Sequence, residues 1–174
     1  MSLDQSLDLD LLREVEAFIF KEARYADDSA YDEWEALLTD DMHYWVPAGR
    51  AIGNPAEQLS FINDNRARVR SRIRQMRNAK RHAQTPRSPL SRVISNVEVL
   101  GIEGGDPMSD GSTTIAIASF VIYELAAQST HELRIWPGRY TYRLRRVDGE
   151  LKIAAKWVEL VTATEAQPNM TFII

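Results

Sequence analysis

The hydrophobic positions in the first half of the chain recur with a helical period in three places. Apolar side chains three or four residues apart predict amphipathic helices over residues 8–24, 29–38 and 64–79. Their buried stripes are Leu11, Val15, Phe18 and Ile19 in the first, Tyr31, Trp34 and Leu38 in the second, and Val69, Ile73 and Met76 in the third. Two short strands, Met42–Val46 and Leu59–Ile62, are predicted between the last two helices.

From residue 90 onward the hydrophobic pattern is that of strands. We expect long strands over residues 92–102, 113–125, 132–146 and 151–164, followed by a short apolar tail over residues 171–174. Asp148-Gly149, before the last long strand, is typical of a two-residue hairpin turn. Helices mainly within 8–80 and strands mainly within 90–164 predict one α+β domain over residues 1–174, in which three helices pack in a strongly curved antiparallel or mixed sheet.

The predicted strand 113–125 is apolar on both of its faces. Its even positions carry Ala116, Ala118, Phe120 and Ile122, and its odd positions carry Ile115, Ile117, Val121, Tyr123 and Leu125. The helices of so short a chain can cover only one face of the sheet, so a second apolar face indicates contact with another subunit. We expect the even face to make that contact. The alternative is a bulge near Ser119 that shifts the pleat.

Composition limits the class of protein. The chain has 174 residues, of which 44% are hydrophobic and 26% charged, the balance of a globular protein rather than a disordered one. It contains no cysteine, so it cannot supply a thiolate nucleophile or a cysteine ligand to an iron–sulfur cluster. The first residues are acidic where a secretion signal is basic, and no apolar run approaches the ~18 residues of a membrane span. We therefore expect a cytoplasmic protein with no membrane partner.

The net charge of −4 is unevenly distributed along the chain. Residues 1–64 hold 15 acidic and 4 basic side chains, whereas residues 65–97 hold 10 basic side chains and no acidic one. Such an arginine block can bind nucleic acid, but the acidic chain and the lack of aromatic residues among the arginines disfavour this function. We expect the block to meet the acidic N-terminal third of its own chain or of a partner, with Arg70 and Arg74 as candidate subunit contacts.

The chain has no self-contained catalytic motif. His43, His82 and His131 lack the spacing of metal ligands, and glycine-rich phosphate loops and nucleophile elbows are absent. We therefore expect no catalytic, cofactor-binding or metal-binding residue. The alternative is a pocket between helices and sheet, in which an aspartate or histidine removes a proton beside a carbonyl group. The candidates for lining it are Asp32, Asp41, His43, Tyr44, Tyr140, Tyr142 and Trp157.

Short stretches along nearly the whole chain match one known family in order and spacing. They are Val15–Phe18, Glu22–Arg24, Tyr31–Trp34, Leu37–Asp41, Tyr44–Pro47, Arg87–Arg92, Ile94–Val97, Gly138–Tyr140, Leu144–Gly149, Lys152–Ala154 and Asn169–Ile174. Together they resemble the small (β) subunit of the aromatic-ring-hydroxylating dioxygenases, the terminal components of Rieske non-haem iron oxygenases. That subunit is part of the wider cone-shaped family related to nuclear transport factor 2.

The resemblance implies two kinds of subunit with different tasks. In that family the α subunit carries a Rieske [2Fe–2S] cluster and a mononuclear iron, and a reductase or ferredoxin delivers electrons to it. The β subunit is structural and binds no cofactor, and an α3β3 assembly is implied. We expect this chain to be a non-catalytic β subunit that supports the α subunits in aromatic compound catabolism. The alternative is a free-standing cone-fold isomerase or dehydratase that uses the pocket described above.

Overall fold

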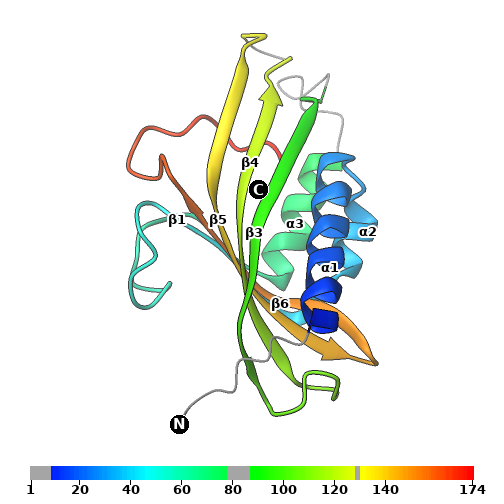
Figure 1. The fold of residues 1–174 in the computed structure, drawn as a ribbon. Coiled ribbons are helices and arrows are strands. Elements are labelled where there is room, and N and C mark those ends of the chain that lie inside the picture. Colours follow the sequence, from blue (N-terminus) through cyan, green and yellow to red (C-terminus); the bar gives the residue numbers. More distant parts are fainter. Residues whose placement is uncertain (1–8, 78–86, 128–129) are drawn as a thin grey trace.

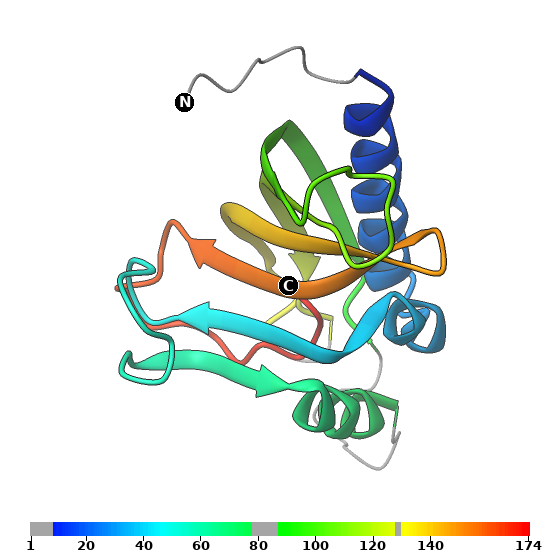
Figure 2. The same cartoon turned by 90° about the horizontal axis from the view of Figure 1, so that it is seen from below.

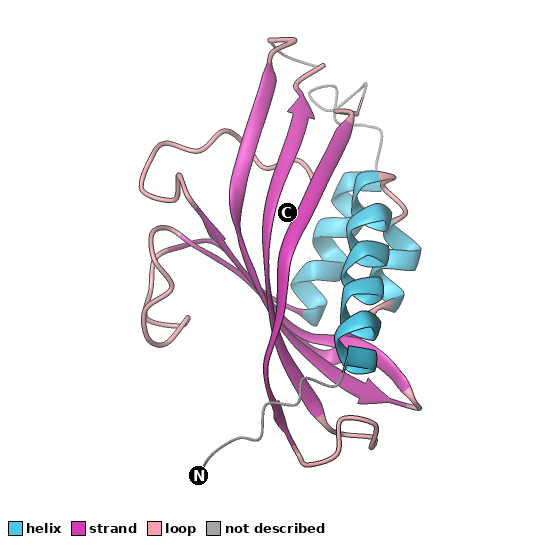
Figure 3. Cartoon of the chain, in the orientation of Figure 1, coloured by secondary structure: helices cyan, strands magenta, loops and turns pink. Residues whose placement is uncertain are grey.

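The computed structural model of the chain describes residues 9–77, 87–127 and 130–174. The helices in these ranges are α1 (Leu9–Asp27), α2 (Tyr31–Ala36) and α3 (Arg66–Arg77). The strands are β1 (Leu38–Pro47), β2 (Ser60–Asn65), β3 (Leu90–Glu103), β4 (Thr113–Leu125), β5 (Leu133–Val147) and β6 (Glu150–Leu160). The predicted α+β class is confirmed, because the molecule combines helices with a sheet of long strands (Figure 3). The helices lie mainly in the first half of the chain and the long strands in the second. Lys80, Arg81 and His82 lie outside the described residues.

The six strands form one curled sheet that does not close on itself (Figure 1). Their order is β2-β1-β6-β5-β4-β3, and every neighbouring pair is antiparallel except β1 and β6, which run parallel. The helix α1 packs against β3 and α2, while α3 packs against β1 and β2 (Figure 2). The molecule is therefore a cone, with the sheet as its wall and the helices in its concave side.

The alternation along β5 determines which side chains enter the cone. Tyr140, Tyr142 and Leu144 are fully buried, and the residues between them point outward. The turn from β5 to β6 is made by Asp148 and Gly149, whose φ angles are 51° and 78°. Positive φ at both positions is the geometry of a type I′ turn, so the predicted hairpin is confirmed.

The strand β1 starts four residues earlier than the sequence pattern predicted. Its first residue, Leu38, pairs with Ile153 of β6, and the Ile153 amide donates to the Leu37 carbonyl oxygen at 2.7 Å. The stretch Thr39-Asp40-Asp41, which the sequence pattern leaves between the predicted helix 29–38 and the predicted strand Met42–Val46, is part of this strand. Pairing with β6, which is distant in sequence, extends β1. The local hydrophobic pattern does not predict this extension, because it does not reveal which strands pair.

The strand β4 buries its even face inside the chain, which corrects the expectation that this face meets another subunit. Ala116, Ala118, Phe120 and Ile122 are at most 2% exposed. The pairing of β4 with β5 has no register shift. The two shifts against the other neighbour lie in β3, between Ser95 and Glu98 and between Val99 and Gly101. The pleat of β4 stays in phase, so its odd positions point away from the cone.

Residues 172–174 fold into the cone. Phe172, Ile173 and Ile174 are 4%, 1% and 0% exposed. The Tyr44 hydroxyl donates to the Ile174 carbonyl oxygen at 3.0 Å and accepts from the Ile174 amide at 3.1 Å. The Arg92 Nη2 donates to the Ile173 carbonyl oxygen at 2.9 Å. The segment predicted as a short apolar tail is thus part of the core.

Candidate functional site

Three of the predicted pocket residues come together inside the cone. Tyr44, Tyr140 and Tyr142 are at most 1% exposed, on the concave faces of β1 and β5. The ring centroids of Tyr140 and Tyr142 are 5.5 Å apart, and Phe120 stacks on Tyr140 at 3.9 Å. The interior of the cone is therefore rich in aromatic side chains that carry hydroxyl groups.

The other predicted pocket residues lie outside the cone. His43 is on the opposite face of β1 from Tyr44, and its Nε2 lies 2.8 Å from the Asn63 Oδ1. Trp157 packs edge-to-face on Trp45 with ring centroids 5.8 Å apart. Asp41 is exposed and accepts two hydrogen bonds from Arg145, and the exposed Asp32 pairs with Arg77. The structure therefore places no predicted base inside the cone.

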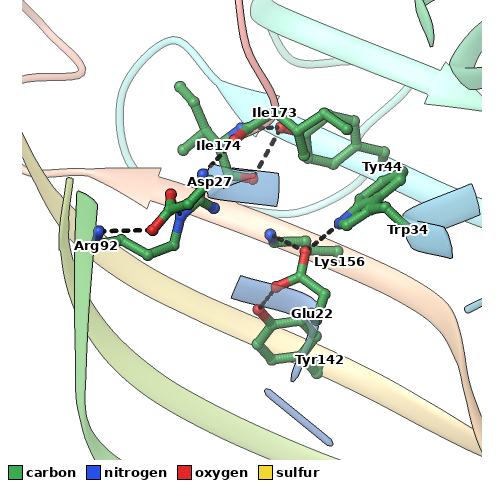
Figure 4. A network of polar contacts seen from close by, with 9 residues as sticks. All are labelled: Glu22, Asp27, Trp34, Tyr44, Arg92, Tyr142, Lys156, Ile173 and Ile174. Atoms are coloured by element: carbon green, nitrogen blue, oxygen red, sulfur yellow. Dashed lines mark hydrogen bonds and ion pairs between the residues drawn. The ribbon is translucent and has the colours of Figure 1, made fainter. Parts of the chain in front are cut away.

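The polar centre of the cone is Glu22, a residue of α1 with no exposed surface. Its Oε1 accepts from the Lys156 Nζ at 2.8 Å and from the Trp34 indole N–H, and its Oε2 accepts from the Tyr142 hydroxyl at 3.1 Å (Figure 4). Lys156 is also fully buried, and its ammonium lies 4.3 Å from the centroid of the Tyr140 ring. One carboxylate thus joins α1, α2, β5 and β6.

A second buried ion pair lies beside the first. The Arg92 Nε donates to the Asp27 Oδ1 at 2.6 Å, and the Arg92 backbone amide donates to the Asp27 Oδ2 at 2.9 Å. From this anchor the guanidinium reaches the Ile173 carbonyl oxygen (Figure 4). The pair therefore connects α1, β3 and the tail.

Burial and charge shift the pKa of Glu22 in opposite directions. Burial raises it, but Lys156, Arg92 and the hydrogen bonds outweigh burial and hold the pKa below the ordinary value of 4.5. Burial lowers the pKa of Lys156 to about 8, and Glu22 opposes that shift. Burial also raises the pKa of the Tyr44, Tyr140 and Tyr142 hydroxyls above the ordinary value of 10. The carboxylate is therefore ionised, and the tyrosines stay protonated.

These groups form a filled polar core instead of a reaction chamber. Removing a proton beside a carbonyl group needs a base that can reach the substrate. Glu22 already accepts hydrogen bonds on both carboxylate oxygens, and residues 172–174 fill the space beside Tyr44 and Arg92. The free-standing isomerase or dehydratase is therefore not favoured.

Sequence reasoning missed the two central charges. Glu22 falls on the apolar stripe of α1, in phase with Phe18 and Ile19, and Lys156 occupies an inward position of β6 in phase with Val158. A charged residue at a buried position in each of two elements was a visible signal for an internal ion pair. The sequence alone does not show that α1 and β6 bring these two side chains together.

The arginine block pairs with acidic residues of its own chain. Glu35 accepts from Arg66 at 2.7 Å and from Arg70 at 2.9 Å. The other pairs are Arg72 with Asp64, Arg77 with Asp32, and Arg92 with Asp27. The expected contact with the N-terminal third is confirmed within the chain. Arg74 is exposed, and its guanidinium donates to the Ser71 hydroxyl.

The outer face of β3, β4 and β5 carries an apolar surface, which we call the outer patch. Its members are Val93, Val121, Tyr123, Leu125, Leu133 and Ile135. Val93 pairs across strands with Val121, Tyr123 with Ile135, and Leu125 with Leu133, so these side chains are neighbours on one face. All except Val121 are more than a third exposed. The second apolar face inferred from the sequence is therefore the odd face of β4.

Within residues 9–77, 87–127 and 130–174, no group of three or more histidine, aspartate or glutamate side chains is placed to hold a metal ion. No helix in those ranges is long and apolar enough to cross a membrane.

A curled, unclosed sheet with helices in its concavity defines a cone-fold protein of the class related to nuclear transport factor 2. The model of the ring hydroxylating beta subunit family matches residues 21–166. The small oxygenase component of the p-cumate 2,3-dioxygenase system of Pseudomonas putida is 31% identical over 146 residues, covering 82% of this chain and 75% of that protein. The chain belongs to the family of ring-hydroxylating β subunits.

Solved structures share the fold. The β subunit of the benzoate 1,2-dioxygenase of Burkholderia mallei superposes with a TM-score of 0.64 at 24% identity, over 99% of this chain and 100% of that one. A Novosphingobium aromaticivorans protein described as a scytalone dehydratase superposes with a TM-score of 0.57 at 15% identity, over 88% of this chain and 86% of that one. The fold alone therefore does not distinguish a subunit from an enzyme, whereas the family match groups this chain with the β subunits.

Proposed function

We propose that this chain is the non-catalytic, structural β subunit of the terminal oxygenase of an aromatic-ring-hydroxylating dioxygenase. Its task is to hold catalytic α subunits in a cytoplasmic assembly that oxidises aromatic compounds. The observation that carries the proposal is the family match over residues 21–166. The filled cone supports it, because the interior groups are bonded to one another and to the tail instead of facing a substrate.

The cofactors belong to the α subunit in this proposal. A Rieske cluster needs cysteine thiolates together with histidines, and this chain has no cysteine. The residues present therefore do not fit that cluster, and the described histidines are not grouped with other ligands for a mononuclear iron. The Rieske [2Fe–2S] cluster, the mononuclear iron and the docking of the reductase or ferredoxin are assigned to α.

Two surfaces are proposed for assembly. The outer patch is the first, because an apolar face of this kind is stabilised by burial against another subunit. The exposed arginines Arg70 and Arg74 of the block are the second, because guanidinium groups bind carboxylates of a partner in fixed geometry. An α3β3 complex, with β subunits touching one another and α, uses both surfaces.

Affinity purification of the tagged chain from its native cells tests the proposal. We expect a larger chain with the Rieske ligand pairs C-x-H and C-x-x-H to co-purify, and we expect iron to follow the larger chain after the two are separated. Recovery of this chain without any partner, or near-stoichiometric iron on this chain alone, would contradict the proposal.

A further inference from the structure

Residues 172–174 contact the cone interior as a bound small molecule would. The Phe172 ring packs edge-to-face on Trp136, with ring centroids 5.6 Å apart. The next two backbone oxygens, of Ile173 and Ile174, accept hydrogen bonds from Arg92 and Tyr44. An aromatic wall with a few buried donors is the usual composition of a pocket for a small organic ligand.

The groups that hold the tail are fixed by other parts of the chain. The Asp27 carboxylate anchors the Arg92 guanidinium through its Nε at 2.6 Å. The Trp136 indole N–H donates to the Glu124 Oε2 at 3.0 Å, and Tyr44 lies in the middle of β1. The Trp136 ring and the Arg92 guanidinium are therefore oriented independently of residues 172–174, as in a preorganised site.

The interior has more donor capacity than the tail uses. The Arg92 Nη1 and the Tyr140 hydroxyl are buried and find no partner in the part of the chain that the structure describes. Buried polar atoms are rarely left in this state, so the two unused donors point to an acceptor that the tail does not supply. The buried cations Lys156 and Arg92 already face the carboxylates of Glu22 and Asp27, and a further buried carboxylate, that of Glu124, is bonded to Trp136. Such an interior favours a neutral acceptor over an anion.

We propose that the cone contains a binding pocket for a small neutral aromatic carbonyl compound, an aryl ketone or amide, which residues 172–174 occupy from within the chain. The aryl ring takes the place of Phe172 on Trp136, and the carbonyl oxygen faces Tyr44 and Arg92. A cavity of about 30 Å³ already adjoins Phe172, lined by Tyr31, Met76, Leu90 and Thr171 among others. The pocket does not depend on the oxygenase role, because it uses only groups of this chain.

The test uses a full-length variant in which Phe172, Ile173 and Ile174 are all replaced by glycine. Benzamide is the probe, and toluene, which lacks the carbonyl, and benzoate, which is charged, are the comparisons. Isothermal titration calorimetry should show saturable benzamide binding to the variant, weaker binding of both comparison compounds, and none to the parent chain at the same concentration. Adding Tyr44→Phe to the variant should weaken benzamide binding roughly twofold to tenfold, the effect of one hydrogen bond. The matched change Tyr123→Phe, on the outer patch, should have no effect.

The proposal is overturned if the glycine variant keeps its circular dichroism spectrum and cooperative unfolding but does not bind benzamide. It is also overturned if toluene binds as well as benzamide, because the donors then play no part. Should the glycine variant fail to fold, Phe172→Ala opens the ring site alone and should bind toluene. A folded Phe172→Ala that stays empty, or one that also fails to fold, would show that the tail is simply core.

Discussion

At the scale of single residues, the buried pair of Glu22 and Lys156 decides how the cone is filled. Removing two charges from water is costly, and the attraction between them offsets that cost only when the remaining polar atoms are also bonded. Glu22 meets this condition through Trp34 and Tyr142. Such a pair adds little net stability over an apolar core. Removing either partner, however, leaves the other as an unpaired buried charge, which is strongly destabilising.

Replacing Lys156 by methionine should therefore destabilise the chain strongly. The change leaves the Glu22 carboxylate buried without its cation, and we expect a loss of about 3–5 kcal/mol in the free energy of unfolding measured by urea denaturation. The double variant Glu22→Gln with Lys156→Met should recover part of that loss. Lys152→Met is the matched control on the same strand, where the ammonium reaches the Ala36 carbonyl near the surface. We expect it to cost less than about 1 kcal/mol. Additive losses in the double variant would contradict the coupling.

Stability should decline in acid, because several carboxyl groups have folded-state pKa values below their ordinary values. These groups are Glu22, Glu35 and Asp41. A depressed carboxyl pKa contributes stability that is present above the ordinary pKa and is lost as the pH falls below it. We expect the free energy of unfolding to decrease as the pH falls from about 5 to 3. Glu22→Gln should show a shallower decrease, and an unchanged slope would mean that Glu22 is not ionised in the native state.

At the scale of elements, β4 shows what a sequence pattern can and cannot specify. The alternation identified the strand and the residues of each face, because the side-chain period of a strand is two. It could not say which of two apolar faces enters the cone, since that depends on where the helices pack. The Glu22 and Lys156 pair and the extension of β1 escaped prediction for the same reason, because each depends on contacts between segments far apart in sequence.

Aspartate substitutions on the two faces of β4 should have different effects. Phe120 stacks on Tyr140 and covers Gly138, where a Cβ would lie 2.6 Å from the Phe120 ring. We expect Phe120→Asp to abolish folding, because it buries an unpaired charge. Val121→Asp lies on the outer patch and should leave circular dichroism unchanged while weakening self-association measured by light scattering. A folded Phe120→Asp variant, or a Val121→Asp variant with unaltered assembly, would contradict this assignment of faces.

At the scale of the whole molecule, five arginines in the described part of the basic block pair with acidic residues within the chain, and exposed arginines of the block are available for assembly. The five are Arg66, Arg70, Arg72, Arg77 and Arg92. Glu35 is shared by Arg66 and Arg70, so Arg70 can change without leaving that carboxylate unpaired. Arg74 makes its described side-chain contact with a neutral hydroxyl. The uneven charge distribution is visible in the sequence. Only the fold separates the arginines that pair with acidic residues of the same chain from those that are exposed to a partner.

Charge reversal of Arg70 and Arg74 to glutamate should leave the fold intact and weaken assembly with α and with other copies of this chain. The loss should be largest at low salt, because screening reduces interactions between exposed charges. Reversal of Arg13 and Arg50, two exposed arginines elsewhere, is the matched control. Sedimentation at several ionic strengths measures the effect. Equal assembly of both double variants would mean that the block is only a solvated surface.

The parallel pairing of β1 with β6 also governs the order in which the chain can fold. The hairpin of β1 and β2 joins the sheet only through β6, so residues 38–65 remain without a partner strand until β6, which begins at Glu150, has been made. Contacts this distant in sequence slow folding and leave a strand edge unpaired in the meantime. During synthesis, the apolar stripe of α1 also stays uncovered until β3, against which it packs, has been made. A chain that stops before β6 therefore exposes apolar surface and unpaired strand edges, and we expect it to aggregate instead of folding partially.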